Sequence, residues 1–426
     1  GTRPHRSARH AERCHRHSHS FGQASLSGSK MPEGDLLQQF HDLAAPEDEA
    51  RCRAAANLRE ILSRDSAKAD GDSLAYAIKR LVRGVQSSRQ CARQGFSLGL
   101  AELLAAFPFE LENVLTLVRQ VTEMQSGLKA HESKERLLGR FFAYVAVLQS
   151  GVLSKETATV DRRKAAEKSA LASLGHGLHE VFVARSYLHA PAVRLLVEIC
   201  STLCAAGRSG LVADVLGGWP VNDSATSGKD GAKVHMIGIA LELRAMHDRL
   251  VADGAEASAL QTWPSICRRD VFAQSGVFKA FVEGLVAEIV GSTGGDELPP
   301  ALAQFFRWWF QASSSSKTAS LAQDQVWPAF DQGLFPDKAP NNSQVQSLRA
   351  LGEIAVQLKA ATAKMTPKQQ DAFTVGIFSQ MPKGLGLLLQ IMSYTRAPAH
   401  VAATFAHSRM VELVGTVQLP GPAPKR

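Results

Sequence analysis

The sequence predicts an all-α protein built as a right-handed α-solenoid of HEAT- or armadillo-like helical pairs. Apolar residues recur at helical spacing, in segments of roughly 12 to 22 residues, from Asp35 to about Val417. Strand patterns bounded by hairpin dipeptides are nearly absent, because Asp70-Gly71 and Asp230-Gly231 both lie in polar stretches. The helical segments are too numerous for one four-helix bundle, so stacked helical pairs fit better.

Several predicted helices carry ordinary start signals. Pro46 precedes three acidic residues in a first turn, and Asp72 and Thr366 fit N-caps, the latter with Pro367 at the first helical position. Stretches rich in Gly, Ser, Pro and Asn at 217–233, 291–300, 312–320 and 335–343 predict surface loops. The clearest helical segments are 48–62, 72–86, 88–106, 110–125, 132–149, 190–206, 234–252 and 345–361.

Composition divides the chain into three regions. Residues 1–30 have almost no large apolar side chains, so we predict a disordered basic tail or a translated leader that ends before Met31. The alternative, an organelle transit peptide, lacks a usable apolar face, since only Phe21 and Leu26 would form it. We expect residues 31–417 to be a single α-solenoid and residues 418–426 to be a Pro-rich tail.

The net charge of +8 is distributed unevenly over the 426 residues. Residues 1–30 carry +5 and the rest only +3, so the high pI alone does not indicate that the folded part binds nucleic acid. The six cysteines form no CxxC pair and lack the density of a secreted disulfide scaffold. No apolar run reaches the roughly 18 to 20 residues of a membrane helix, and 141–148 comes closest. We therefore expect a soluble, intracellular protein without membrane contacts.

The stretch 76–104 is the most informative part of the chain. At about 100° per residue, four apolar side chains share one sector of a first helix: Leu74, Ile78, Leu81 and Val85. Basic residues project from the opposite side, two more lie near the start of a second helix, and no acidic residue follows before Glu102. We predict a helical hairpin whose basic cluster contacts nucleic acid through Lys79, Arg80, Arg83, Arg89 and Arg93.

The same basic cluster has a simpler interpretation as a solvated helix face. A helix face of this kind usually carries compensating carboxylates at i, i+4, and none is present here. Phosphate or acidic-protein binding therefore stays open beside the solvated face. Contact with phosphates would be independent of base sequence and sensitive to salt.

Catalytic motifs are missing from the sequence. A polymerase site needs paired aspartates that hold two metal ions, and the only Asp-x-Asp, Asp70-Gly71-Asp72, fits a loop that ends as a helix N-cap. No P-loop, GxSxG, HExxH or GxGxxG pattern occurs. We predict that the protein is not an enzyme and that it binds no cofactor, metal or small-molecule substrate. An enzyme would have to gather His, Asp or Glu from distant helices, which spacing cannot reveal.

Three other groups of residues fit structural roles better than functional ones. Cys200 and Cys204 could hold a metal from one helical turn, but the helix is otherwise apolar, so core packing is favoured. The tail segment 14–19, with Cys14 and three histidines, could bind a metal adventitiously. The aromatic run 305–310, together with Trp263 and Trp327, is expected to pack between neighbouring helices rather than to stack on bases.

Two segments, 76–84 and 88–104, resemble the signature of the Myb-binding protein 1A / DNA polymerase phi family. Weaker similarities occur at 40–44, 51–62, 141–153 and 326–334. The resemblance implies a nucleolar and nuclear protein of ribosomal RNA gene transcription and ribosome biogenesis, which associates with rDNA chromatin and with transcription or ribosome-assembly proteins. The alternative is a generic α-solenoid adaptor for proteins, without nucleic-acid binding.

Overall fold

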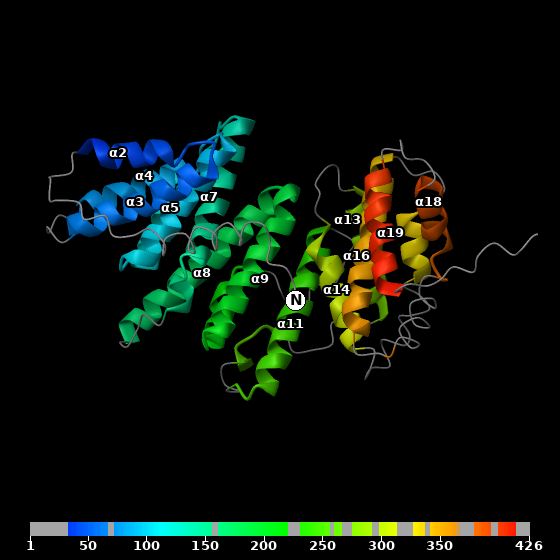
Figure 1. Ribbon diagram of the computed structural model, residues 1–426. Coiled ribbons are helices and arrows are strands. Elements are labelled where there is room, and N and C mark those ends of the chain that lie inside the picture. Colours follow the sequence, from blue (N-terminus) through cyan, green and yellow to red (C-terminus); the bar gives the residue numbers. More distant parts are fainter. Residues whose placement is uncertain are drawn as a thin grey trace, which may run out of the picture. The chain divides into compact units, whose positions relative to one another are not determined.

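The computed structural model is helical wherever it has regular structure (Figure 1). It describes residues 33–66, 72–155, 161–219, 231–255, 260–265, 275–291, 298–312, 327–336, 341–363, 366, 379–392 and 399–414. No strand occurs in these ranges, so the prediction of an all-α protein is confirmed for them. The predicted tails 1–30 and 418–426, and the helix predicted to begin at Pro367, lie outside the described residues.

Contacts within the chain define two compact units. The first holds Gly1–Leu188 and Glu198–Trp219, and the second holds His189–Val197 and Pro220–Arg426. The single solenoid over residues 31–417 stays a prediction.

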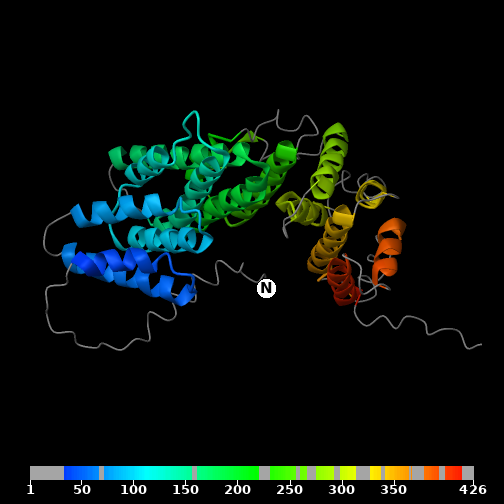
Figure 2. The ribbon, with the colours of Figure 1, turned by 90° about the horizontal axis from the view of Figure 1, so that it is seen from above.

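The first unit is a succession of helices that pack on near neighbours in the chain. Its helices are α2 (Glu33–Asp42), α3 (Asp48–Ser66), α4 (Asp72–Gly84), α5 (Gln90–Ala106), α6 (Leu111–Val121), α7 (Ala130–Gln149), α8 (Asp161–Ala184) and α10 (Val212–Leu216), with 3₁₀ turns at Val152–Ser154, Ser186–Leu188 and Ser209–Leu211. Helix α3 packs on α2 and α5, α5 on α7, and α8 on α6, α7 and α10. Figure 2 shows these helices following one another in chain order across the unit.

The hairpin of α4 and α5 has the orientation that the apolar spacing predicts. Ile78, Leu81 and Val85 are buried, and Leu74 is half-buried. On α5, a Cβ at Gly95 would lie only 1.8 Å from the carbonyl oxygen of Leu43. Only glycine therefore lets α5 approach the end of α2 this closely.

Most predicted helix ends differ from those in the structure, by up to four residues. The predicted helix 110–125 ends at Val121, and at its end both the N–H and the hydroxyl of Thr122 donate to the Val118 carbonyl, the hydroxyl at 2.7 Å. The buried Arg140 guanidinium then donates to both oxygens of Thr122, at 2.9 and 3.1 Å, and to the Glu180 carboxylate. This network fixes the turn between α6 and α7.

The second unit is built from more apolar helices. They are the first residues of α9 (His189–Ala205), then α11 (Gly231–Ala252), α13 (Ser275–Gly291), α14 (Pro300–Ala312), α16 (Asn341–Thr362), α18 (Pro382–Met392) and α19 (His400–Val414). Helix α14 packs on α11 and α16, and α16 packs on α13, α18 and α19. The buried Asp331 carboxylate accepts the backbone N–H of Gly384 at 2.9 Å and caps the start of α18.

The aromatic run is part of the core of this unit, as the sequence predicts. Phe305 and Phe306 are fully buried, and Trp309 is nearly so. Phe306 stacks on Trp327 with ring centroids 5.7 Å apart, and Trp309 lies 5.0 Å from the same indole. Burial of these rings excludes them from base stacking.

One helical stretch differs from the expectation that no segment is as long and apolar as a membrane helix. Ser186–Ala205 has the length and hydropathy of a membrane-crossing helix, and 44% of its most apolar window is buried inside the protein. Val193, Leu196 and Ile199 are fully buried. The core helix of a soluble protein meets the same criteria, so the stretch is weak evidence for a membrane span.

Candidate nucleic-acid interface

The basic residues of α4 lie on its exposed side. Lys79, Arg80 and Arg83 are all exposed, and Leu81 and Val82, between them in sequence, are fully buried. The side chains of Lys79 and Arg83 form no ion pair or hydrogen bond with any residue in the described ranges. Their charges are therefore available to solvent or to a partner.

Arg80 is held more firmly than the sequence indicates. Its guanidinium lies over the Phe40 ring of α2, 5.0 Å from the ring centroid, and donates to the Tyr76 hydroxyl at 3.0 Å. A cation–π contact at an exposed site contributes about 0.5–1 kcal/mol. Arg80 therefore contributes to the packing of α4 on α2, whereas spacing alone predicts a purely solvated side chain.

The two arginines of the second helix anchor the turn between α4 and α5. Arg89 donates to the Ala44 carbonyl at 3.0 Å, and Arg93 donates to the carbonyls of Ser87 and Ser88 at 2.7 and 2.9 Å. Arg93 is half-buried, while Arg89 is exposed. Because a guanidinium has five N–H donors, each arginine keeps donors that these carbonyls do not use.

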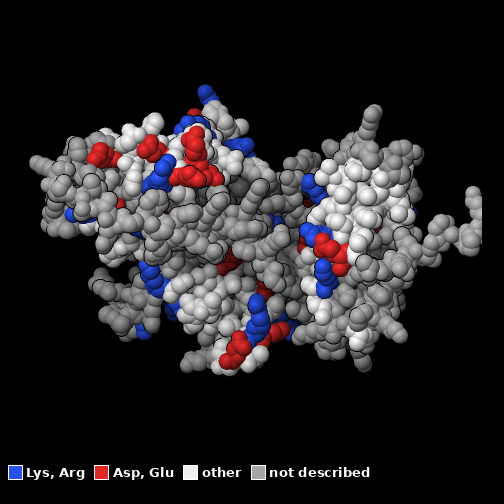
Figure 3. Space-filling view, viewed as in Figure 1, with Lys and Arg blue, Asp and Glu red and all other residues white. Residues whose placement is uncertain are grey.

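No carboxylate of the described residues forms an ion pair with any of the five basic side chains. Glu102, the first acid after the cluster, pairs instead with Arg59 of α3 at 2.8 Å. The face of the first unit visible in Figure 3 carries Lys and Arg interspersed with Asp and Glu. On that face, neither sign of charge dominates.

The remaining sequence candidates have structural environments. Cys200 is fully buried in α9 and Cys204 is half-buried, as core packing predicts. Asp72 is the first residue of α4, so its role as an N-cap stays a prediction, while Asp70 and the tail segment 14–19 lie outside the described residues.

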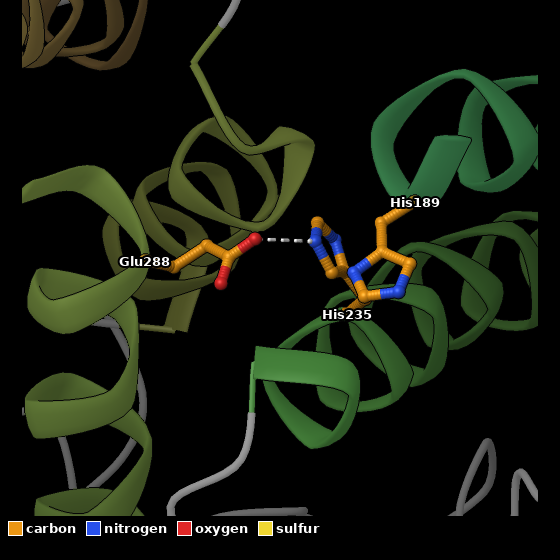
Figure 4. Close-up of side chains that lie close together, drawn as sticks. All are labelled: His189, His235 and Glu288. Atoms are coloured by element: carbon orange, nitrogen blue, oxygen red, sulfur yellow. Dashed lines mark hydrogen bonds and ion pairs between the residues drawn. The ribbon is translucent and has the colours of Figure 1, made fainter. Parts of the chain in front are cut away.

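A cluster that spacing did not reveal lies in the second unit (Figure 4). His189 begins α9, His235 lies in the second turn of α11, and Glu288 lies in the last turn of α13. Nε2 of His235 lies 3.4 Å from Oε1 of Glu288, and the two imidazole centroids are 5.3 Å apart. Because 45 or more residues separate each from the next, only the fold brings them together.

Electrostatics within this cluster favour an ionised Glu288 carboxylate and a neutral His189 imidazole. Burial, followed by the neighbouring His235, lowers the pKa of His189, although Glu288 opposes this. The hydrogen bond with His235 is the main cause that lowers the pKa of Glu288. The cluster thus combines two nitrogen donors with one anionic oxygen donor.

Comparison with known proteins places the basic cluster inside a matched region. Residues 76–239 match the model of the family described as DNA polymerase phi, so the resemblance seen at 76–104 is confirmed for this part of the chain. This region runs from α4 into α11 and includes all five basic residues.

Relatives are similar over about 30% of the chain. Myb-binding protein 1A of Rattus norvegicus is 32% identical over 141 residues, which are 30% of this chain and 10% of the relative. The Homo sapiens protein of that name is 31% identical over 150 residues, 32% of this chain and 11% of the relative. The rDNA transcriptional regulator pol5 of Schizosaccharomyces pombe is 28% identical over 126 residues, which are 29% of this chain and 12% of the relative. The chain thus matches about a tenth of the length of these relatives.

Proposed function

We propose that this chain is a non-enzymatic scaffold of the nucleus and nucleolus, which acts in ribosomal RNA gene transcription and ribosome biogenesis. In this proposal it binds rDNA chromatin together with transcription or ribosome-assembly proteins. Support comes from relatives that are named as a Myb-binding protein and as an rDNA transcriptional regulator. Neither name describes an enzyme, and the sequence has no carboxylate pair suited to two-metal catalysis outside a capping loop.

The proposal includes a right-handed α-solenoid of HEAT- or armadillo-like pairs. In the first unit, the main packing contacts of α2 to α8 are with helices up to three places away in chain order. This is the contact pattern of stacked helical repeats, where each unit buries its apolar face against its neighbours. Such stacks present extended surfaces that suit a scaffold.

The main support for nucleic-acid binding is the positive charge of the basic cluster, which is formed by Lys79, Arg80, Arg83, Arg89 and Arg93. These side chains come from two consecutive helices, and none forms an ion pair with a described carboxylate. Uncompensated cations on one edge attract phosphates, and binding releases counterions from the nucleic acid. The contact is therefore proposed to be independent of base sequence.

The test is a salt titration of duplex DNA binding by the full chain, measured by fluorescence anisotropy. If about three to five side chains reach phosphates, log K against log salt has a slope of roughly −3 to −4. Because Arg80, Arg89 and Arg93 also hold the fold, the informative variant is Lys79→Gln with Arg83→Gln. It should weaken binding at every DNA sequence and flatten the slope by about two.

The matched control removes two charges elsewhere in the same unit. Arg53→Gln with Lys134→Gln changes two exposed side chains of α3 and α7, outside the cluster. If this control and the cluster variant have equal slopes, the DNA affinity comes from the net positive charge of the whole chain, including residues 1–30. It then does not come from the cluster. In that case the adaptor function is favoured, and an acidic peptide would be the ligand to titrate next.

A further inference from the structure

We propose that His189, His235 and Glu288 form a zinc-binding site in the second unit (Figure 4). One donor atom from each side chain can be chosen so that all lie within 4.8 Å of one another. The sequence predicts no metal, and this site is separate from the basic cluster on α4 and α5. The proposal does not depend on the nucleic-acid function.

The donor set suits zinc. Two imidazole nitrogens and one carboxylate oxygen are common zinc ligands, and three protein ligands leave a fourth tetrahedral position for water. Magnesium and calcium prefer oxygen ligands only, so the two histidines disfavour them. Among first-row divalent ions, such a site binds zinc more tightly than manganese or iron.

The distances are close to those that a tetrahedral ion requires. Zinc bonds of about 2.0–2.2 Å place neighbouring ligand atoms roughly 3.3–3.6 Å apart. The 3.4 Å between Nε2 of His235 and Oε1 of Glu288 already has this length. The other two separations between ligand atoms are at most 4.8 Å, so they have to shorten by no more than about 1.5 Å to reach the tetrahedral spacing. In Figure 4 the Glu288 carboxylate points toward the two imidazoles from the opposite side.

Glu288 and His189 both lie at helix ends, where the helix dipole affects the charge that each side chain favours. Glu288 lies in the last turn of α13, where the helix dipole disfavours a carboxylate unless a cation is near. His189 lies at the first position of α9, where the dipole disfavours a protonated imidazole. The neutral imidazole and the ionised carboxylate are the forms that bind metals.

The burial of the ligand side chains also supports a zinc site. The His235 side chain is 1% exposed, and the Glu288 side chain is 29% exposed. Water can thus enter from the side of Glu288, and a zinc ion there would tie α9, α11 and α13 together. Metal bound only by the folded unit stabilises that unit.

The experiment is a zinc titration of the chelator-treated full chain against a chromophoric chelator. All proteins carry changes that remove adventitious binding by the tail: Cys14→Ser, His15→Gln, His17→Gln and His19→Gln. We expect one zinc equivalent, and a rise in Tm of roughly 5–10 °C at a hundredfold excess of zinc over Kd. Glu288→Gln and His189→Gln should each lower the affinity at least about tenfold, which at the same zinc concentration cuts the rise in Tm to about half or less.

The matched control is His176→Gln in the first unit. His176 lies 3.4 Å from Glu180, the same nitrogen–oxygen distance as in the proposed site, but both are exposed on one helix and no third ligand joins them in the described residues. This variant should bind zinc like the parent. His235→Gln tests the buried ligand, with circular dichroism to verify that it folds.

Two outcomes would overturn the proposal. One is a parent protein that binds no zinc equivalent. The other is a parent and a Glu288→Gln variant that bind zinc equally, because the metal would then be held elsewhere. Both results can be read even if His235→Gln does not fold, since Glu288 and His189 are partly exposed.

Discussion

Tyr144 gives a pH-dependent prediction whose size follows from the structure. Its side chain lies in the core of the first unit, where burial raises its pKa from 10.0 to about 12, against the opposing charge of Arg140. A Cβ at Gly177 would lie 2.0 Å from the Tyr144 hydroxyl, so no space for water exists on that side. The phenolate form is therefore disfavoured in the folded protein.

The sign follows from proton linkage. Below about pH 10 the phenol is protonated in both states and has no effect on stability. Between about pH 10 and pH 12 the unfolded chain loses the proton and the folded chain keeps it, so stability falls as pH rises. A pKa raised by about two corresponds to roughly 2–3 kcal/mol.

The assay is urea denaturation of the parent and Tyr144→Phe at about pH 9 and about pH 11. Phenylalanine keeps the ring and cannot ionise, so the difference between the two proteins cancels the titration of lysines elsewhere. We expect Tyr144→Phe to gain about 1–2 kcal/mol relative to the parent between the two pH values. A difference that does not change with pH would refute the argument from burial.

Three further substitutions test packing by urea denaturation. Gly95→Ala should cost at least about 1–3 kcal/mol, because its Cβ would collide with the Leu43 carbonyl oxygen; an unchanged midpoint would contradict the close approach. Gly386→Ala should stabilise by about 0.5–1 kcal/mol, because a methyl group added at this exposed helical glycine would meet no atom within 4 Å and alanine favours helix. Phe305→Ala should cost about 3–5 kcal/mol, since the ring is fully buried among aromatic neighbours.

Helical periodicity was sufficient to predict what depends on local geometry. The exposed side of α4 follows from the positions of Leu81 and Val85 alone, because side chains three and four residues apart share a face. The bonds of Arg89 depend on the approach of Ala44, which lies 45 residues earlier, and no local pattern contains that information. The cluster of His189, His235 and Glu288 was missed for the same reason.

The structure divides the basic cluster into three side chains that are anchored in the fold and two, Lys79 and Arg83, that have no ion pair or hydrogen bond in the described residues. This division affects how the cluster would bind phosphates. Arg80, Arg89 and Arg93 are already fixed by a ring and by backbone carbonyls, so binding costs them little conformational entropy. Lys79 and Arg83 must be ordered when they bind, which costs up to about 1.5 kcal/mol for each side chain. If the cluster binds phosphates as proposed, the anchored arginines would supply preorganised affinity, and Lys79 and Arg83 would adapt to different phosphate positions. A scaffold that contacts DNA without reading its sequence benefits from both kinds of side chain. The positions of the DNA phosphates vary from site to site, whereas their charge is the same at every site.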